Sequence, residues 1–345
     1  MFEEKRNIFF IQEHLEKKIF HGGIGNVDIE KILMQHNFKP LLFPYHYDFS
    51  IRAKLSRFYF LVKTILNLKP ASLIVIQFPL YARMNKLLVQ LLPLLKRAKI
   101  IYIIADIDGL KDDDHSLLQK EIRSFKKVRY FIVHNNNMRQ WFLSTVPEGK
   151  FSLLYFFDFM APYCFKPRSK TNIIAFAGNL SKSLFLEQLH QINSEPLQFN
   201  LYGPGFTALM NDQKNISYKG QFEPYTLPQL LQGSFGLVWD GNSIDGEGGS
   251  IGNYMRYITH HKVSLYILAG LPIIIYEKAG AAELIKQYNI GFTISNLFEI
   301  EQKIKLLTDN DYQQMILNMR GLAEKISTGK FLENALNEII RQIVD

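Results

Sequence analysis

Short apolar runs alternate with longer amphipathic stretches along the first half of the chain. Apolar runs bounded by polar residues predict buried strands, and apolar residues spaced three and four positions apart predict helices. The predicted strands are Ile8–Gln12, Leu41–Pro44, Leu73–Gln77, Ile100–Ile104 and Tyr130–Val133, and the predicted helices are Lys54–Leu66 and Asn85–Lys96. Strands that alternate with helices at this spacing form a parallel sheet covered on both faces.

The same alternation starts again after a break near residue 160. Pro162 and Pro167 bracket a connecting segment in which the strand and helix pattern is lost. Further strands are predicted at Asn172–Ala177, Phe199–Tyr202, Ile216–Gly220, Phe235–Trp239 and Pro272–Tyr276, and the chain is helical from Glu299 onward. The pattern predicts an α/β protein with two doubly wound parallel-sheet domains, residues 1–160 and 161–328, followed by a terminal helix over residues 329–345.

A helix predicted after a Gly-rich acidic loop carries the clearest chemical pattern. We expect Thr259 to cap this helix, which opens with His260, His261 and Lys262 and stops at Gly270. The N-terminus of a helix presents free N–H groups and the positive end of the helix dipole. An anion such as a diphosphate would therefore be held both by the backbone and by the basic side chains.

Acidic and polar side chains stand at other predicted strand and helix ends. Glu283 falls in the opening turn of the helix after strand Pro272–Tyr276, where a carboxylate can accept hydrogen bonds from ribose hydroxyls. Asp106 and His134 follow predicted strands of the first domain. Ligands bind beyond the carboxyl ends of parallel strands, so both are candidate site residues, although the segment at His134 fits a helix cap at Asn137 equally well.

Composition excludes several classes of protein. Hydrophobic residues make up 47% and charged residues 21% of the 345 residues, as in ordinary globular proteins. The single cysteine, Cys164, excludes an intramolecular disulfide framework and is typical of a reducing compartment. The first residues lack the pattern of a secretory signal, and no apolar run approaches the ~20 residues of a spanning helix. We therefore expect a cytoplasmic protein.

The net charge of +8 favours anionic partners. Arg52, Lys54, Arg57 and Lys63 interleave with apolar residues in one predicted helix, which fits either a solvated basic face or peripheral contact with the anionic inner leaflet of a membrane. No RNP, helix-turn-helix or zinc-finger signature is present, so nucleic acid is not an expected partner. The pattern leaves association into a homo-oligomer open.

Three known binding motifs are absent from the sequence, which excludes some kinds of site. Residues 240–247 are rich in oxygen ligands, but the twelfth position of an EF-hand loop would be Ile251, so we expect no metal site. The chain lacks the Gly-x-x-x-x-Gly-Lys-Ser/Thr phosphate loop, which argues against kinase or ATPase chemistry of that kind. The Gly-rich turn at residues 21–25 lacks the Gly-x-Gly-x-x-Gly spacing of dinucleotide-binding enzymes, so we expect no cofactor and disfavour a sugar-nucleotide epimerase or dehydrogenase.

Three motifs occur in one order in the second half of the chain. They are Gly236-Leu237-Val238-Trp239-Asp240-Gly241, Tyr254-x-Arg256-Tyr257, and His261-Lys262-Val263-Ser264-Leu265-Tyr266 running into Ala269-Gly270-Leu271-Pro272. In this order they resemble the donor half of GT-B glycosyltransferases. More narrowly, they resemble the bacterial beta-1,6-galactofuranosyltransferases of polysaccharide biosynthesis and the related Gtf3-like glucosyltransferases.

The resemblance implies a GT-B fold, with an acceptor-binding first domain and a donor-binding second domain facing across a cleft, and a terminal helix that crosses back to the first domain. It puts the donor near Gly178, Lys182, Tyr257, His261, Lys262 and Glu283, and the transferred sugar near Gly22 and Gly23. Asp106-Ile107-Asp108 resembles the His-Asp-Ile-Asp pattern of these enzymes, but Ala105 stands in place of the histidine. This leaves Asp106 as the expected catalytic base.

The activity that the resemblance implies is transfer of a hexose, galactofuranose first, from a UDP-sugar donor to a glycan or lipid-linked acceptor. Lys182, His261 and Lys262 would stabilise the leaving UDP in place of a metal ion. We expect Lys262 to be a free cation that affects binding and hardly affects stability. A retaining UDP-glucose-dependent transferase and a non-catalytic GT-B-like glycan-binding or chaperone protein remain alternatives.

Overall fold

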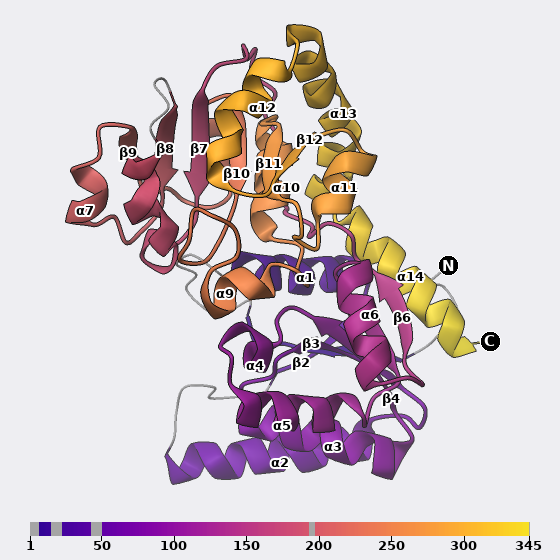
Figure 1. Ribbon diagram of the computed structural model, residues 1–345. Coiled ribbons are helices and arrows are strands. Elements are labelled where there is room, and N and C mark those ends of the chain that lie inside the picture. Colours follow the sequence, from indigo (N-terminus) through magenta and orange to yellow (C-terminus); the bar gives the residue numbers. More distant parts are fainter. Residues whose placement is uncertain (1–6, 15–22, 43–49, 193–196, 345) are drawn as a thin grey trace.

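The computed structural model describes residues 7–14, 23–42, 50–192 and 197–344. Two six-stranded parallel sheets, each flanked by helices, form two domains that meet along one side (Figure 1). This architecture confirms the predicted pair of doubly wound parallel sheets.

The first sheet has the strand order β2-β1-β3-β4-β5-β6. Its strands are β1 (Ile8–Ile11), β2 (Lys39–Leu41), β3 (Leu73–Phe78), β4 (Lys99–Ile104), β5 (Tyr130–Val133) and β6 (Lys150–Leu153). The helices of this part of the chain are α1 (Ile24–Gln35), α2 (Ile51–Asn67), α3 (Arg83–Lys96), α4 (Asp108–Lys111), α5 (His115–Phe125) and α6 (Asn136–Thr145).

The second sheet has the strand order β12-β11-β10-β7-β8-β9. Its strands are β7 (Ile173–Ala177), β8 (Gln198–Tyr202), β9 (Ile216–Gly220), β10 (Phe235–Val238), β11 (Ile273–Tyr276) and β12 (Gly291–Ile294). The helices are η1 (Leu180–Lys182), η2 (Leu184–Gln191), α7 (Ala208–Asn211), α8 (Leu227–Leu230), α9 (Gly249–Tyr254), α10 (His261–Ala269), α11 (Ala282–Gln287), η3 (Leu297–Glu299), α12 (Ile300–Leu306), α13 (Asp309–Ser327) and α14 (Lys330–Val344).

Side chains of the central strands point alternately to two separate layers of core. In β3, Val75 belongs to the core that also contains residues of α1 and α14, whereas Ile74 and Ile76 pack with α2, α3 and α5. A strand buried on both faces takes apolar residues at nearly every position, which explains the apolar run Leu73–Ile76 of β3. The first of these cores continues into the second domain, so the two domains share buried apolar contacts.

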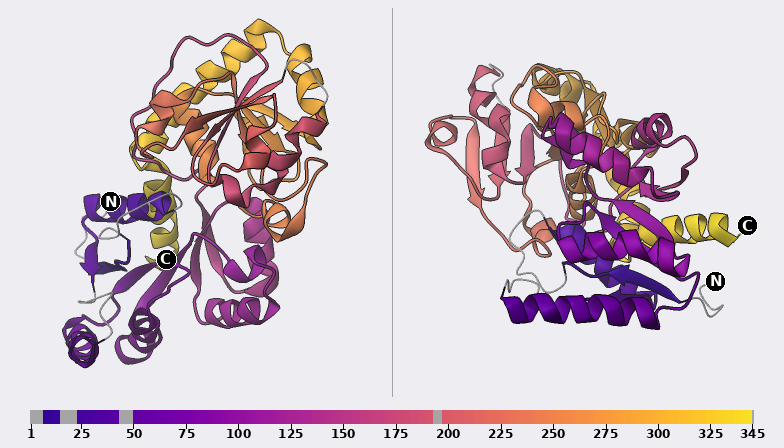
Figure 2. Two further views of the ribbon diagram at one scale, coloured as in Figure 1. Left: turned by 90° about the vertical axis from the view of Figure 1, so that its left-hand side faces the viewer. Right: turned by 90° about the horizontal axis from the view of Figure 1, so that it is seen from below.

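Helix α14 returns from the second domain to the first, where it packs against β5 and β6 (Figure 2). The carboxylate of Asp158 accepts hydrogen bonds from the N–H groups of Phe331 and Leu332 at the start of this helix. Ser152 of β6 donates to the carbonyl of Ala335 at 2.9 Å. The last helix therefore covers the edge of the first sheet.

Several predicted boundaries were wrong by a few residues. Strand β2 covers Lys39–Leu41 rather than Leu41–Pro44, of which residues 43 and 44 lie outside the described residues. Helix α6 is capped by Asn135, whose side chain accepts from the N–H of Met138, and not by Asn137. In the described part of the chain, no helix is both long and apolar enough to cross a membrane.

Candidate functional site

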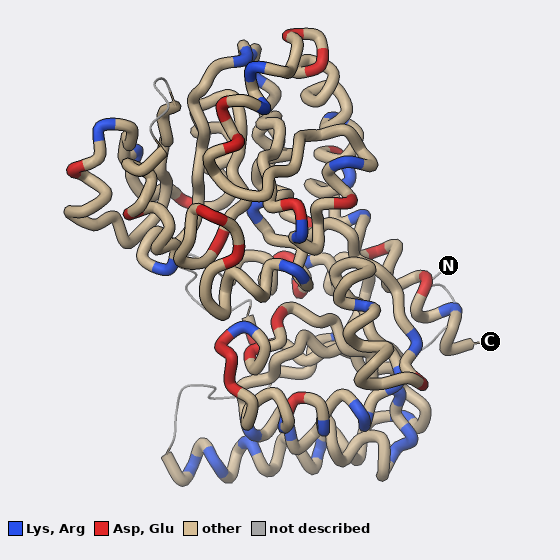
Figure 3. The backbone as a smooth tube through the Cα atoms, viewed as in Figure 1, with Lys and Arg blue, Asp and Glu red and all other residues tan. Residues whose placement is uncertain are grey.

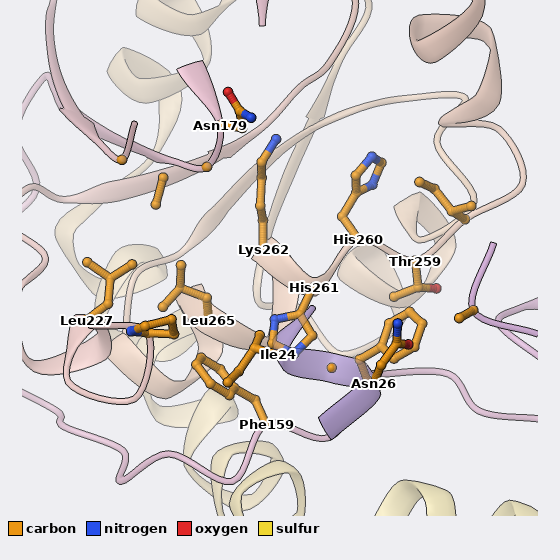
Figure 4. A pocket seen from close by; sticks show the side chains of 18 of the residues that line it. Ile24, Asn26, Phe159, Asn179, Leu227, Thr259, His260, His261, Lys262 and Leu265 are labelled. Atoms are coloured by element: carbon orange, nitrogen blue, oxygen red, sulfur yellow. The ribbon is translucent and has the colours of Figure 1, made fainter. Parts of the chain in front are cut away.

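A cavity of about 450 Å³ lies between the two domains, at the carboxyl ends of strands from both sheets. From the first domain it is lined by Gly25 and Asn26 of α1, Asp106 after β4 and His134 after β5, and from the second by Gly178, Lys182 and residues 258–262 (Figure 4). Strand order in the second sheet reverses between β7 and β10. Open parallel sheets bind ligands at such a point, so the topology itself accounts for the location of the cavity.

An ion pair lies directly behind the wall of the cavity. Lys262 Nζ lies 2.6 Å from Asp240 Oδ1, and His260 Nε2 lies 2.9 Å from Asp240 Oδ2. Burial alone would raise the pKa of Asp240, but the charge of Lys262 and the imidazole of His260 hold that pKa well below its ordinary value. Lys262 is therefore not the free cation that the sequence suggested.

The position of Lys262 also depends on residues of β7 and the turn after it. Its Nζ atom lies 4.5 Å from the centre of the Phe176 ring. A Cβ atom on Gly178 would lie 3.0 Å from Lys262 Cε, so the glycine leaves the space that the lysine stem fills. Two residues named from the sequence, Gly178 and Lys262, are thus brought into contact.

Helix α10 begins one residue later than expected, and Thr259 does not cap it. The N-cap is His260, without a side-chain cap. The hydroxyl of Thr259 instead accepts a hydrogen bond from Asn135 Nδ2, at 3.2 Å, across the domain interface. The other end of α10 is as predicted: Gly270 adopts the left-handed conformation, at φ 63°, that ends the helix.

His261 points in the opposite direction from Lys262, toward α1 (Figure 4). It packs edge-on against Phe159, with ring centres 4.7 Å apart, and its Cδ2 atom would lie 3.1 Å from a Cβ atom on Gly25. Burial lowers the pKa of His261 to about 4, although a hydrogen bond to the backbone of Asp158 opposes this. Its buried Nε2 atom has no hydrogen-bond partner among the described residues. A neutral imidazole with one unused nitrogen therefore faces the cavity.

Asp106 lines the cavity from the first domain. Its Oδ2 atom lies 3.1 Å from Lys111 Nζ, and Lys111 also pairs with Asp108 at 2.5 Å. Burial raises the pKa of Asp106, and Lys111 offsets part of this rise. A carboxylate with a raised pKa is a stronger base than an exposed one, which suits proton removal from a hydroxyl.

His134 joins the two domains at the floor of the cavity. The N–H of Thr259 donates to His134 Nδ1 at 3.2 Å, so the proton of this neutral ring must be on Nε2, which donates to the carbonyl of Ile104 at 2.8 Å. Burial lowers the pKa of His134 to about 4. Close by, the Tyr254 hydroxyl accepts from the N–H of Ile107 at 2.8 Å. The segment before α10 is therefore fixed to the first domain.

Other residues named from the sequence do not line this cavity. Tyr257 is half-buried and packs against the first-domain core, and Glu283 is exposed in the first turn of α11. Gly23 is the N-cap of α1, two positions from the cavity-lining Gly25, and Gly22 lies outside the described residues. In the described ranges, no group of three or more His, Cys, Asp or Glu side chains is arranged to hold a metal ion.

Sequence reasoning missed the positioning role of Asp240 and the contact that His134 makes. His134 directly follows the buried strand β5, and Asp240 lies two positions after the buried strand β10. A position just after a buried strand is the same signal that made Asp106 a candidate. Neither has a nearby partner in the sequence: Asp240 pairs with a lysine 22 positions later, and His134 binds a backbone group 125 positions later. Only the fold reveals these pairings.

Comparison with known proteins identifies the family. The glucosyltransferase 3-like N-terminal domain matches residues 11–147, and the glucosyltransferase 3-like C-terminal domain matches residues 174–339. Among relatives, the beta-1,6-galactofuranosyltransferase WbbI of Escherichia coli (strain K12) is 28% identical over 251 residues, covering 71% of this chain and 72% of that protein. Glucosyltransferase 3 of Streptococcus gordonii is 24% identical over 330 residues, covering 93% and 94%.

Solved structures of the same architecture are more distant in sequence. Sucrose-phosphate synthase from Thermosynechococcus elongatus superposes with a TM-score of 0.67 at 13% identity and covers 99% of both chains. Anabaena HepE in complex with UDP and glucose gives a TM-score of 0.60 at 13% identity, covering 95% of this chain and 99% of that one. These likenesses show the fold. Together with the two matching domains, they establish that the chain belongs to the glucosyltransferase 3-like family of GT-B glycosyltransferases.

Proposed function

We propose that this glycosyltransferase moves a hexose, with galactofuranose as the first candidate, from a UDP-sugar donor to a glycan or lipid-linked acceptor in surface polysaccharide biosynthesis. The observation that carries the proposal is the interdomain cavity, which has cationic side chains of the second domain on one wall and the carboxylate of Asp106 on the other. Such a cavity suits a reaction in which an anion leaves while a hydroxyl loses its proton.

On the donor side, we assign the diphosphate to the start of α10 and the turn after β7. Lys262 and Lys182 supply positive charge, and the first turn of α10 supplies backbone N–H groups. Gly178 allows a ligand to approach the backbone closely. Because His261 is neutral at pH 7, its proposed role is a hydrogen bond to the donor and not the supply of positive charge. These groups offset the charge that develops on the leaving UDP.

Three donor assignments rest on the resemblance rather than on the cavity. Glu283, in the first turn of α11, would accept hydrogen bonds from the ribose of the donor. Tyr257 would lie near the donor as well. Both lie outside the cavity lining, so a donor that reaches them must extend beyond it. Gly23 with Gly22 would lie beside the transferred sugar.

On the acceptor side, Asp106 is the proposed base of an inverting transfer. It removes the proton of the acceptor hydroxyl as the new glycosidic bond forms and the bond to UDP breaks. A transfer with retention of configuration would not need this base. The names of the relatives support two candidate sugars, since one is a galactofuranosyltransferase and another, matching 93% of the chain, is a glucosyltransferase.

A donor panel tests the proposal. Purified protein is incubated with UDP-galactofuranose, UDP-galactopyranose and UDP-glucose beside a candidate acceptor, and UDP release is measured. We expect release with UDP-galactofuranose and its loss in Asp106→Asn, while Asp112→Asn, an exposed neighbour, keeps activity. Release with UDP-glucose alone, with a retained anomeric configuration by NMR, would favour the glucosyltransferase. No release with any donor, despite UDP binding, would favour the non-catalytic alternative.

A further inference from the structure

Helix α2 has two apolar faces, of which only one is covered by the protein. Its inner face packs on the first sheet through Ala53, Leu61 and Thr64. Its outer face carries a second apolar stripe at helical spacing, formed by Ile51, Leu55, Phe58, Tyr59, Val62 and Leu66. Ile51 and Leu66 at the ends of the stripe are 76% and 71% exposed. A continuous exposed stripe of this kind is uncommon on soluble surfaces and marks an interaction site.

Basic residues flank this stripe, and acidic residues are absent. Arg52, Lys54 and Lys63 are exposed on the same helix. Residues 51–105 contain ten Lys and Arg and no Asp or Glu, so the remainder of the chain has 30 basic against 32 acidic residues. The excess positive charge of the chain therefore comes entirely from this segment. In Figure 3, α2 carries several blue positions and no red one.

Helix α3 extends the same surface. It packs beside α2 at the end of the first domain that lies farthest from the second domain (Figures 1 and 2). Leu94 and Leu95 are exposed near its end, and it also lacks acidic residues. The two helices form one basic apolar face, defined here as the exposed residues of α2 and α3. This face leaves the interdomain cavity unobstructed.

We propose that the basic apolar face docks on an anionic lipid bilayer. Apolar side chains enter the acyl boundary of such a surface while the flanking Arg and Lys side chains contact lipid phosphates. A second copy of the chain fits this face less well. In a symmetric contact, two surfaces that both carry basic and no acidic residues would face and repel each other. Nucleic acid would use the charge but would leave the apolar stripe unexplained. The inference does not depend on which sugar is transferred.

Sedimentation with vesicles tests the proposal. The wild-type protein is mixed with vesicles of phosphatidylethanolamine and phosphatidylglycerol in equal parts, and with vesicles of phosphatidylcholine alone. We expect it to sediment with the anionic vesicles only. The triple variant Arg52→Gln, Lys54→Gln, Lys63→Gln should bind about a hundredfold more weakly, since each cation near an anionic surface contributes about 1 kcal/mol. The triple variant Leu55→Ser, Phe58→Ser, Leu66→Ser should lose at least tenfold.

Matched variants on the second domain provide the control. Leu209, Leu306 and Leu317 are exposed leucines there, and Lys286, Lys303 and Lys325 are exposed lysines. Changing them in the same way should leave vesicle binding intact, and thermal melts should show that all variants fold. Equal losses in the control variants, or equal binding to phosphatidylcholine, would overturn the proposal. So would a wild-type dimer that the α2 leucine and phenylalanine variant abolishes without any vesicle binding.

Discussion

Lys262 Nζ donates to Asp240 Oδ1 over 2.6 Å, which connects the first turn of α10 to the end of β10. Only 16% of each side chain is exposed. Removing Lys262 would take away the cation that offsets the buried charge of Asp240 and leave His260 as the remaining partner of this carboxylate. Lys262 must therefore contribute to the stability of the fold as well as to the binding of any anion beside Gly178.

We predict that Lys262→Ala lowers both UDP affinity and stability. A lost charge-assisted contact to phosphate should weaken binding ten- to hundredfold. Without Lys262, the carboxylate of Asp240 keeps only His260 beside it. The free energy of unfolding should therefore fall by about 2 kcal/mol, less than for a fully buried pair that loses its one partner. Calorimetric UDP titration and urea unfolding measure the two effects separately.

A double variant distinguishes the two roles. In Lys262→Ala, Asp240→Asn the buried carboxylate that lost its lysine partner is also gone, so we expect most of the stability to return while UDP affinity stays low. If UDP affinity returned together with stability, the effect of Lys262 on binding would be structural and the donor assignment would fail.

Asp106→Asn should reduce turnover by about a hundredfold or more, the usual contribution of a general base, while UDP affinity stays unchanged. Initial rates and UDP titration of the same preparation give the two quantities. Turnover equal to that of the wild type would exclude Asp106 as the base.

The neighbour of this carboxylate gives a pH test. Lys111 lowers the pKa of Asp106, so Lys111→Ala should raise it. A base is active when deprotonated, and its activity is lost as the pH falls through its pKa. The acid limb of the rate profile should therefore move to higher pH in Lys111→Ala. An acid limb at the same pH as in the wild type would mean that another group controls it.

UDP should stabilise the protein more than ADP or GDP does. A ligand that binds only the folded state adds about 2.7 kcal/mol at a hundredfold excess over its dissociation constant. Thermal melts with each nucleotide at equal concentration measure this. Equal shifts with all three would indicate a diphosphate site without preference for uridine.

Stability should fall in mild acid because of His134. Its folded pKa is lowered to about 4 by burial, whereas an unfolded histidine titrates near 6.5. Between these values the unfolded chain binds a proton that the folded protein excludes, so stability is full above pH ~6.5 and is lost as the pH falls toward ~4, by on the order of 3 kcal/mol. Urea unfolding should show a shallower pH dependence in His134→Gln, and an unchanged one in the exposed His115→Gln. Equal slopes in all three proteins would contradict this account.

The parallel sheets were predictable because burial on both faces imposes a strong local pattern. The apolar runs Leu73–Ile76 of β3 and Ile100–Ile104 of β4 are typical of strands buried on both faces, and the end of α10 follows from the conformational freedom of Gly270. The start of α10 was not predictable, because Asn135 of the other domain binds the hydroxyl of Thr259. A helix start predicted from neighbouring residues is wrong where a residue distant in the sequence binds the capping side chain instead.

The motifs behind the family resemblance include many residues with structural roles. The Tyr266 hydroxyl donates to the carbonyl of Leu237 and accepts from the N–H of Ala177, so it bridges β10 and β7. Gly236 is needed because a Cβ atom there would lie 2.3 Å from the Tyr266 ring. A motif therefore marks a region that borders the interdomain cavity, but it does not separate the residues that would touch a ligand from those that hold this region together.

The path of α14 has a consequence for the order in which the chain folds. During synthesis the strands of the first domain leave the ribosome early, but α14, which covers β5 and β6, is made only after all the strands of the second domain. Leu332, Leu336 and Ile339 are almost completely buried in the finished protein, so their partner surface stays open until then. The second domain can complete its sheet while the first still lacks its final layer, and a fragment that stops near residue 160 would keep an apolar surface exposed to aggregation.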